Sequence, residues 1–325
     1  MLFTGALLHP RFSMRIVFMG TPDLARTVLS RIVSSGVVEV VGVVAQPDRP
    51  VGRHLELTPP PVKVEALLHG LPVLQPAKAR EPQFLEQLRA WQPDVIVVAA
   101  YGQILPQALL DIPRHGCLNV HTSLLPRWRG AAPIQWAIAE GDAESGVCLM
   151  RMEAGLDTGP VVATLRTPIA DTDTGRTLHD RLAELGGRIV VESLPAYVRG
   201  ELIPVTQPTE GVTYARKISR EDGRLDWAMP ARVLWRRLRA FDPWPGGFCF
   251  VPASGTGARK LLKVHVAQPV DGVGGEPGIV VSAGKDGLVV ACGDGALRLE
   301  EVQVEGSRRV SAAAFLAGHA VTRLE

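Results

Sequence analysis

RIVFMG, residues 15–20, is a short apolar run that ends at a glycine. An unbroken apolar run of this length is typical of a parallel strand that is buried on both faces. After it, Leu24, Val28 and Ile32 recur at helical spacing, and Asp23 stands where a helix cap is expected. The segment therefore predicts a buried strand that is followed at once by an amphipathic helix.

The same pattern repeats over the first two hundred residues. VVEVVGVVAQ (37–46) is rich in β-branched residues and predicts a central strand. DVIVVAA (94–100), CLNV (117–120) and VCLMRM (147–152) predict further strands, with helix-like stretches such as FLEQLRAWQ between them. This alternation predicts an α/β fold with a doubly wound, Rossmann-like, mostly parallel sheet, whose ligands bind beyond the carboxyl ends of the strands.

The pattern changes near residue 200. GELIPVTQPTEGVTY is polar and contains prolines, as linkers often do, and the helix-like segment ARVLWRRLRAF follows it. Several short, glycine-punctuated strands then predict a small antiparallel, OB-like β-barrel. We expect a catalytic domain over 14–200, a linker over 201–219 and a C-terminal domain over 220–325.

Composition narrows the class of protein. Of the 325 residues, 46% are hydrophobic and 21% charged, which suits two globular domains, and no apolar run approaches the ~20 residues that cross a bilayer. Four widely separated cysteines without a C-x-x-C pair indicate reduced thiols of a cytoplasmic protein, rather than disulfides or a zinc site. Residues 1–13 lack the features of a secretory signal and are expected to be a short extension, with Met14 as a second candidate start.

The segment CLNVHTSLLPRWRGAAPIQWAI (117–138) carries the candidate chemistry. Asn119 and His121 are two residues apart on a strand, so their side chains point the same way. Asp157 follows in the glycine-flanked AGLDTGP (154–160). An amide that donates to an oxyanion, an imidazole that moves protons and a carboxylate that orients the imidazole predict acyl transfer. Taken singly, each residue also has an ordinary explanation as a strand-end histidine or a turn-forming aspartate.

The motif N-V-H-T-S-L-L-P-R-W-R-G, with the later G-L-D-T-G, resembles the folate-dependent formyltransferase family. The resemblance implies that Asn119, His121 and Asp157 form the catalytic trio. It also implies 10-formyltetrahydrofolate as the co-substrate, with no metal. The tetrahydrofolate-contacting residues that it implies are Ser123, Leu124, Leu125 and Pro126.

Three segments are similar to the family members that formylate the methionine on initiator tRNA: GTP (20–22), QPDRPVGR (46–53) and PRWRGAAPIQ (126–135). The resemblance implies that the proline-rich loop 46–63 enters the acceptor stem, with Arg53 or Arg49 as its basic contact. Lysines often follow this arginine in the family, whereas His54, Leu55 and Glu56 stand here, so we expect weaker loop electrostatics.

A second basic region lies between residues 214 and 242, where eight Lys and Arg stand against four Asp and Glu. Helical spacing puts Arg232, Arg236 and Arg239 along one face of the predicted helix. OB-like barrels commonly bind nucleic acid, so these arginines are predicted to contact tRNA, although a solvated helix face has the same pattern. We expect a monomer that binds tRNA and folate and no membrane.

The sequence leaves alternatives open. The nearest is a formyltransferase for a small amine, either glycinamide ribonucleotide or a nucleotide-linked amino sugar. A nicotinamide-dependent dehydrogenase would share the sheet, but the first strand runs into G-T-P-D instead of G-x-G-x-x-G. A non-catalytic RNA-binding protein would leave Asn119, His121 and Asp157 without a role.

Overall fold

The computed structural model describes residues 14–52, 55–253 and 258–325. Contacts between Cα atoms divide the chain into two compact units. The N-terminal unit contains the residues up to 129 together with 146–166 and 180–213, and the C-terminal unit contains 130–145, 167–179 and 214–325.

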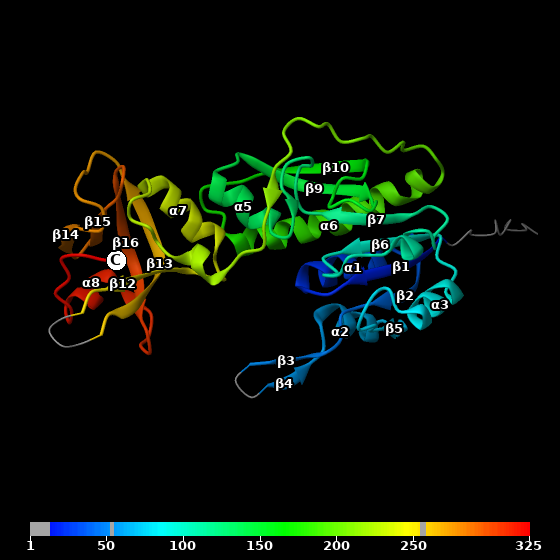
Figure 1. The fold of residues 1–325 in the computed structure, drawn as a ribbon, viewed down its shortest axis with the longest axis horizontal. Helices are drawn as coiled ribbons and strands as arrows, with labels where there is room; N and C mark the ends of the chain where they lie inside the picture. Colours follow the sequence, from blue (N-terminus) through cyan, green and yellow to red (C-terminus); the bar gives the residue numbers. More distant parts are fainter. Residues whose placement is uncertain (1–13, 53–54, 254–257) are drawn as a thin grey trace, which may run out of the picture. The chain divides into compact units, whose positions relative to one another are not determined.

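A seven-stranded sheet with helices packed around it organises the first part of the chain (Figure 1). Its strand order is β10-β9-β7-β6-β1-β2-β5, and the pairs β1–β2, β1–β6, β6–β7 and β2–β5 are parallel. The strands are β1 (Arg15–Gly20), β2 (Glu39–Val44), β5 (Val73–Leu74), β6 (Val95–Ala99), β7 (Cys117–His121), β9 (Glu144–Arg151) and β10 (Val161–Pro168). The helices are α1 (Asp23–Ser35), α2 (Pro61–Leu68), α3 (Pro82–Ala90), α4 (Gln107–Leu110) and α6 (Gly175–Val198), whereas α5 (Pro133–Glu140) belongs to the C-terminal unit.

The central strands are buried on both faces, as their continuous apolar sequences predict. Ile16, Val17, Phe18 and Met19 of β1 all have no exposed surface. The predicted strands at 15–20, 37–46, 94–100, 117–120 and 147–152 are confirmed. Asp23 was expected as the helix cap, which is wrong, because Pro22 occupies the cap position and Asp23 is the first helical residue. The Asp23 carboxylate instead pairs with Arg26, one turn further along the helix.

β9 departs from the parallel order and runs antiparallel to β7, with Leu118 opposite Arg151 and His121 opposite Cys148. The carboxyl end of β9 therefore lies beside the amino end of β7. The loop that follows β9 must fold back along β7 before it can reach the carboxyl edge of the sheet.

The proline-rich segment after β2 is a two-stranded hairpin rather than an irregular loop. β3 (Arg49–Val51) pairs antiparallel with β4 (Glu56–Thr58), and α2 begins at Pro61. Figure 1 shows the hairpin extending away from the rest of the N-terminal unit. Proline at the first position of α2 is favourable, because the missing N–H has no partner in that turn anyway.

The C-terminal unit contains α7 (Ala231–Ala240) and an antiparallel sheet with the order β12-β13-β16-β15-β14, in which β17 also pairs with β16. This arrangement agrees with the predicted OB-like domain. Its strands are β12 (Gly247–Val251), β13 (Lys260–Val270), β14 (Val280–Gly284), β15 (Gly287–Ala291), β16 (Ala296–Val304) and β17 (Val310–Ser311). The remaining elements are β8 (Arg129–Gly130), β11 (Tyr214–Ala215), the 3-10 turn Arg220–Gly223 and α8 (Ala312–Leu316). Within the described residues, no helix is both long and apolar enough to cross a bilayer.

Candidate active site

The three residues predicted to be catalytic lie together. Asn119 and His121 stand two residues apart on β7, and Asp157 reaches them from the loop after β9. Asn119 Nδ2 is 3.5 Å from Asp157 Oδ1, and His121 Nδ1 is 3.7 Å from Asp157 Oδ2. The two oxygens of one carboxylate thus face the amide and the imidazole, in the grouping that the sequence predicts.

His121 is 5% exposed, and its ring orientation is set by the main chain. Its Nε2 lies 2.9 Å from the carbonyl oxygen of Trp128. A carbonyl can only accept, so Nε2 carries the hydrogen and donates it. Nδ1 is consequently the ring nitrogen that faces Asp157 and can take or give a proton. The sequence does not predict this contact, because a main-chain carbonyl leaves no mark on residue identity.

The loop that carries Asp157 has a constrained backbone. Asp157 has a φ of 50°, in the left-handed region that is costly for a non-glycine residue. A Cβ at Gly159 would lie 1.8 Å from the carbonyl oxygen of Arg151, so only glycine fits there. This turn folds the chain back after β9 and brings the carboxylate to β7.

The segment 123–126, implied to contact tetrahydrofolate, follows β7 directly. Ser123 is 1% exposed, and its hydroxyl donates to the carbonyl of Arg127 at 2.7 Å, so it shapes the turn. Leu124, Leu125 and Pro126 are half-buried. The folate-contacting role of these four residues stays a prediction.

One exposed apolar side chain stands directly beside Asp157 in the chain and was missed from the sequence. Leu156 precedes Asp157 and is 61% exposed. Exposed apolar residues beside polar groups are typical of a ligand site. Leu156 and the Asn119 amide thus offer an apolar surface and a hydrogen-bond donor close to Asp157.

A cavity of about 400 Å³ lies at the carboxyl edge of the sheet. It is lined from the ends of β1, β2 and β6, among others by Thr21, Gln46, Arg49 and Ala100. The sheet order reverses between β1 and β6, and ligands of doubly wound sheets bind at such a point. Arg49 also places Nη2 3.4 Å from Gln46 Oε1, and Arg53 lies outside the described residues.

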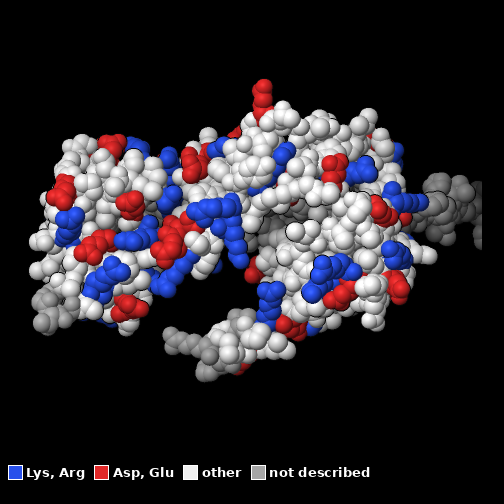
Figure 2. Space-filling model, viewed as in Figure 1, with Lys and Arg blue, Asp and Glu red and all other residues white. Residues whose placement is uncertain are grey.

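A polar network holds the base of the β3–β4 hairpin. Lys63 Nζ donates to both oxygens of Asp48, at 2.9 and 2.7 Å. Gln75 Nε2 donates to Asp48 Oδ1 at 2.7 Å and to the carbonyl of Gln46 at 2.8 Å. These bonds to Gln75 and then Lys63 lower the pKa of Asp48. Figure 2 shows few charged side chains on the described part of the hairpin itself.

The three arginines of α7 have different surroundings within the C-terminal unit. Arg232 pairs with Asp271 at 2.7 Å and is exposed, and Arg236 lies against Gly141. Arg239 Nη1 donates to the carbonyls of residues 170, 171 and 173, and its guanidinium lies 3.9 Å from the centre of the Trp235 ring. Burial lowers the pKa of Arg239. Their tRNA-binding role stays a prediction.

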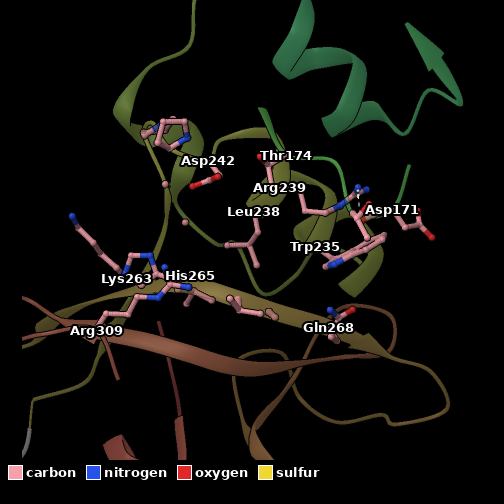
Figure 3. Close-up of a pocket in the computed structure, with 18 residues that line it drawn as sticks. Asp171, Thr174, Trp235, Leu238, Arg239, Asp242, Lys263, His265, Gln268 and Arg309 are labelled. Atoms are coloured by element: carbon pink, nitrogen blue, oxygen red, sulfur yellow. Dashed lines mark hydrogen bonds between the residues drawn. The ribbon is translucent and has the colours of Figure 1, made fainter. Parts of the chain in front are cut away.

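Arg239 also lines a cavity of about 470 Å³ between α7 and β13. Figure 3 shows Arg239 beside Trp235 and Asp171, with Lys263, His265 and Arg309 along the sheet. Arg309 pairs with Glu301, and His265 bonds Gln303 at 3.0 Å. On the face of this unit seen in Figure 2, basic and acidic side chains alternate and form no field of one sign.

All four cysteines are buried and unpaired. Burial raises the pKa of Cys117 to about 12, so its thiol is a packing group of β7 rather than a nucleophile. Among the residues that the structure describes, no group of three or more His, Cys, Asp or Glu side chains could hold a metal ion.

An oxyanion donor, a proton-carrying imidazole and an orienting carboxylate on a doubly wound sheet define an acyl-transfer site. The family profile for formyl transferases matches residues 14–194, and that for the formyl transferase C-terminal domain matches 217–320. The chain belongs to the formyl transferase family.

Close relatives refine this assignment. The methionyl-tRNA formyltransferase of Myxococcus xanthus is 56% identical over 305 residues, which cover 94% of this chain and 95% of the relative. That of Citrifermentans bemidjiense is 50% identical over 307 residues, 94% of each chain. Within its family, the chain belongs with the methionyl-tRNA formyltransferases.

More distant solved structures share the fold. WlaRD, a sugar 3N-formyl transferase solved in the presence of dTDP and 5-N-formyl-THF, has a TM-score of 0.63 at 16% identity and covers 91% of this chain and 99% of its own. HypX from Aquifex aeolicus, in complex with tetrahydrofolic acid, has a TM-score of 0.61 at 20% identity. It covers 93% of this chain and 47% of its own.

Proposed function

We propose that this enzyme transfers the formyl group of 10-formyltetrahydrofolate to the α-amine of the methionine carried by initiator tRNA. The observation that carries the proposal is the convergence of Asn119, His121 and Asp157 at 3.5 and 3.7 Å in a chain of the formyl transferase family. The folate supplies an activated formyl group when it is bound. Every other step falls to side chains of this chain.

Asn119 and His121 have complementary parts in this chemistry. The Asn119 amide is a fixed donor for the negative charge that develops on the formyl oxygen when the amine attacks. The nucleophile is the acceptor's own amine, so no enzyme nucleophile is needed. Nδ1 of His121 is the site through which the proton of the attacking amine can leave, because Nε2 is engaged by Trp128. Asp157 stabilises the imidazolium that results. When the bond between the formyl carbon and the folate nitrogen breaks, the imidazolium can give its proton to that nitrogen, which returns His121 to its neutral form.

The nature of the acceptor rests on the relatives and on the hairpin. The two relatives described above are both named for methionyl-tRNA. A hairpin that projects from the catalytic sheet and is held at its base offers a rigid surface to a large acceptor. Rigidity lowers the entropy that would otherwise be lost when the complex forms.

The two parts of the chain would then divide the work. Residues 14–200 are proposed to carry the chemistry, 201–219 to link, and 220–325 to bind tRNA, with the local excess of positive charge as support. The basic contacts proposed are Arg49, Arg53, Arg232, Arg236 and Arg239. Unpaired buried thiols and a translation substrate support a cytoplasmic enzyme, which we propose to act as a monomer.

The direct test is a transfer assay with labelled 10-formyltetrahydrofolate and three acceptors. Charged initiator Met-tRNA should be formylated, and elongator Met-tRNA and glycinamide ribonucleotide should react far more slowly. Transfer to the ribonucleotide without transfer to either tRNA would assign the chain to a small amine instead.

Variants of the trio test the chemistry within the same assay. Asn119→Ala and His121→Ala should each lower kcat about 10²- to 10³-fold, the usual loss for a transition-state donor. His69→Ala is the matched control, because the exposed His69 contacts Glu65 at the end of α2 and its loss should leave kcat within about twofold. Normal turnover in both trio variants would remove them from the mechanism.

A further inference from the structure

The carbonyl oxygens of the Asp157 loop converge on one side chain from a distant part of the sequence. Gln207 Nε2 donates to the carbonyl of Asp157 and to that of Gly159, each at 2.8 Å. A carboxamide nitrogen has two hydrogens, so this one group satisfies both carbonyls. Gln207 lies 50 residues after Asp157, in the segment expected to be a linker, and it is 8% exposed.

Arg129 determines which way the Gln207 amide faces. Its Nε and Nη2 donate to Gln207 Oε1 at 3.1 and 2.8 Å, and Arg129 is 9% exposed. A guanidinium only donates, so the amide oxygen must face Arg129 and the amide nitrogen must face the loop. The direction of these hydrogen bonds is therefore fixed: Arg129 donates to Gln207, and Gln207 donates to the Asp157 loop. The bonds from the Arg129 guanidinium to Gln207 are charge-assisted, so they are stronger than the neutral bonds from Gln207 to the loop carbonyls.

The dipeptide Trp128-Arg129 also orients His121. The carbonyl of Trp128 orients His121, and the side chain of the next residue, Arg129, orients the support of the Asp157 loop. A shift of this dipeptide or of Gln207 would alter the separation between His121 Nδ1 and the Asp157 carboxylate. Catalytic rates depend steeply on such separations, and about 1 Å of misplacement can cost about 10²-fold.

We infer that Gln207 and Arg129 are positioning residues of the formyl-transfer site, acting through Asp157. The inference rests on the proposed function. It gives the segment after α6 a part in the reaction, in addition to joining two regions of the chain. Both residues act at one remove, through hydrogen bonds, and neither is a catalytic residue.

Gln207→Glu is the sharpest variant. It keeps the shape of the side chain and an oxygen for Arg129, but it turns a donor into a carboxylate that faces two carbonyl oxygens. We expect kcat to fall about 10- to 100-fold, with the KM values for folate and Met-tRNA within about threefold of the wild type. The control is Gln87→Glu, which adds the same charge on the exposed face of α3 in the N-terminal unit and should leave kcat unchanged.

A double-mutant cycle separates positioning from a merely structural role. Wild type, Gln207→Glu, Asp157→Asn and the double variant are compared by kcat for formylation of Met-tRNA. If Gln207 acts through Asp157, the double variant should be no more than about threefold slower than Asp157→Asn alone. Losses that multiply, or a Gln207→Glu enzyme with normal kcat, would overturn the inference.

Should Gln207→Glu fail to fold, Arg129→Lys enters the same cycle, because it keeps the charge and loses the two-point fork. The wild type is assayed first in the same reaction, so a failure of the proposed function appears as absence of transfer before any variant is compared.

Discussion

His121 is anchored to Trp128, seven residues further along the chain, by a hydrogen bond of 2.9 Å from its Nε2 to the main-chain carbonyl. Trp128 has a φ of 63°, and its N–H donates to the hydroxyl oxygen of Thr213 at 2.9 Å. The carbonyl of Thr213 also accepts from the N–H of Arg129 at 2.9 Å. The imidazole therefore depends on a peptide that Thr213 holds from both its side chain and its backbone.

Thr213→Val tests this dependence. The substitution keeps the shape and removes the acceptor, which leaves the Trp128 N–H without its partner. The free energy of unfolding should fall by about 1–3 kcal/mol, and kcat should fall about 3- to 10-fold as the carbonyl under His121 shifts. Thr213→Ser keeps the hydroxyl and should restore kcat, so equal losses in both variants would contradict the prediction. Steady-state kinetics and urea unfolding provide the two measurements.

The base of the hairpin should govern affinity for the macromolecular acceptor. Lys63→Met removes the cation that bonds both oxygens of Asp48 and leaves the α2 backbone unchanged. The KM for Met-tRNA should rise about 3- to 10-fold because more hairpin conformations must be ordered on binding, while the KM for the folate stays unchanged. Lys78→Met removes the same charge from an exposed position and serves as the control. A rise in both KM values would point to general misfolding instead.

Asp222 should stabilise the C-terminal unit in a pH-dependent way. Its carboxylate accepts hydrogen bonds from the Arg216 guanidinium. It also accepts from the N–H of Ser219 at 2.8 Å and from the Ser219 hydroxyl at 2.9 Å. The Arg216 guanidinium itself lies over the Trp136 ring. These bonds, that of Arg216 foremost, hold the pKa of Asp222 well below its usual range. A lowered pKa gives stability that is present above the unfolded-state pKa of about 3.9 and is lost as the pH falls towards the folded-state pKa.

Asp222→Asn should accordingly lower the free energy of unfolding by about 1–3 kcal/mol at pH 7, towards the low end because Arg216 is largely exposed. The difference from the wild type should narrow as the pH is lowered to 3. Urea unfolding at both pH values measures it, with the exposed Asp286→Asn as the control for loss of charge alone. A gap that widens in acid would reverse the sign and refute the assignment.

The thiols should be inert in the folded enzyme. With a pKa of about 12, Cys117 is thiolate in about one molecule in 10⁴ at pH 8, and burial raises the pKa of Cys292 to about 11. Iodoacetamide at pH 8 should leave activity and mass unchanged over the time in which a denatured sample gains four adducts. Rapid modification of Cys117 in the native protein would show that β7 opens more readily than its packing suggests.

Hydrophobic pattern predicted the sheet well, because buried strands such as β1 and β6 must be apolar on both faces. The glycine-punctuated strands of the C-terminal unit were predictable for a similar reason, since turns leave clear residue signatures. The hairpin formed by β3 and β4 was not predicted from the sequence, because prolines obscure short strands that carry few ladder hydrogen bonds. The antiparallel direction of β9 was also hidden, since period and composition do not encode strand direction.

Within the site, Asn119, His121 and Asp157 could be selected because the motifs that contain them resemble the formyltransferase family, whereas each residue alone also suits an ordinary strand end or turn. The groups that hold these three residues in place could not be predicted in the same way. Trp128 and the loop after β9 contribute main-chain carbonyls, which any residue type could supply. Gln207 lies in a polar segment that resembles an ordinary linker, and only its burial and its two carbonyl partners reveal what it does.

The left-handed aspartate and the crowded Gly159 have a consequence for protein engineering. Any library that randomises residues 155–159 to retrain the enzyme on a foreign amine will consist mainly of inactive clones, since the bend tolerates no side chain at Gly159. The described strands of the hairpin, Arg49–Val51 and Glu56–Thr58, lie about a hundred residues before that bend in the chain, and the hairpin can be lengthened, recharged or exchanged without changing the bend. Directed evolution of this scaffold should therefore diversify the hairpin and leave the bend untouched.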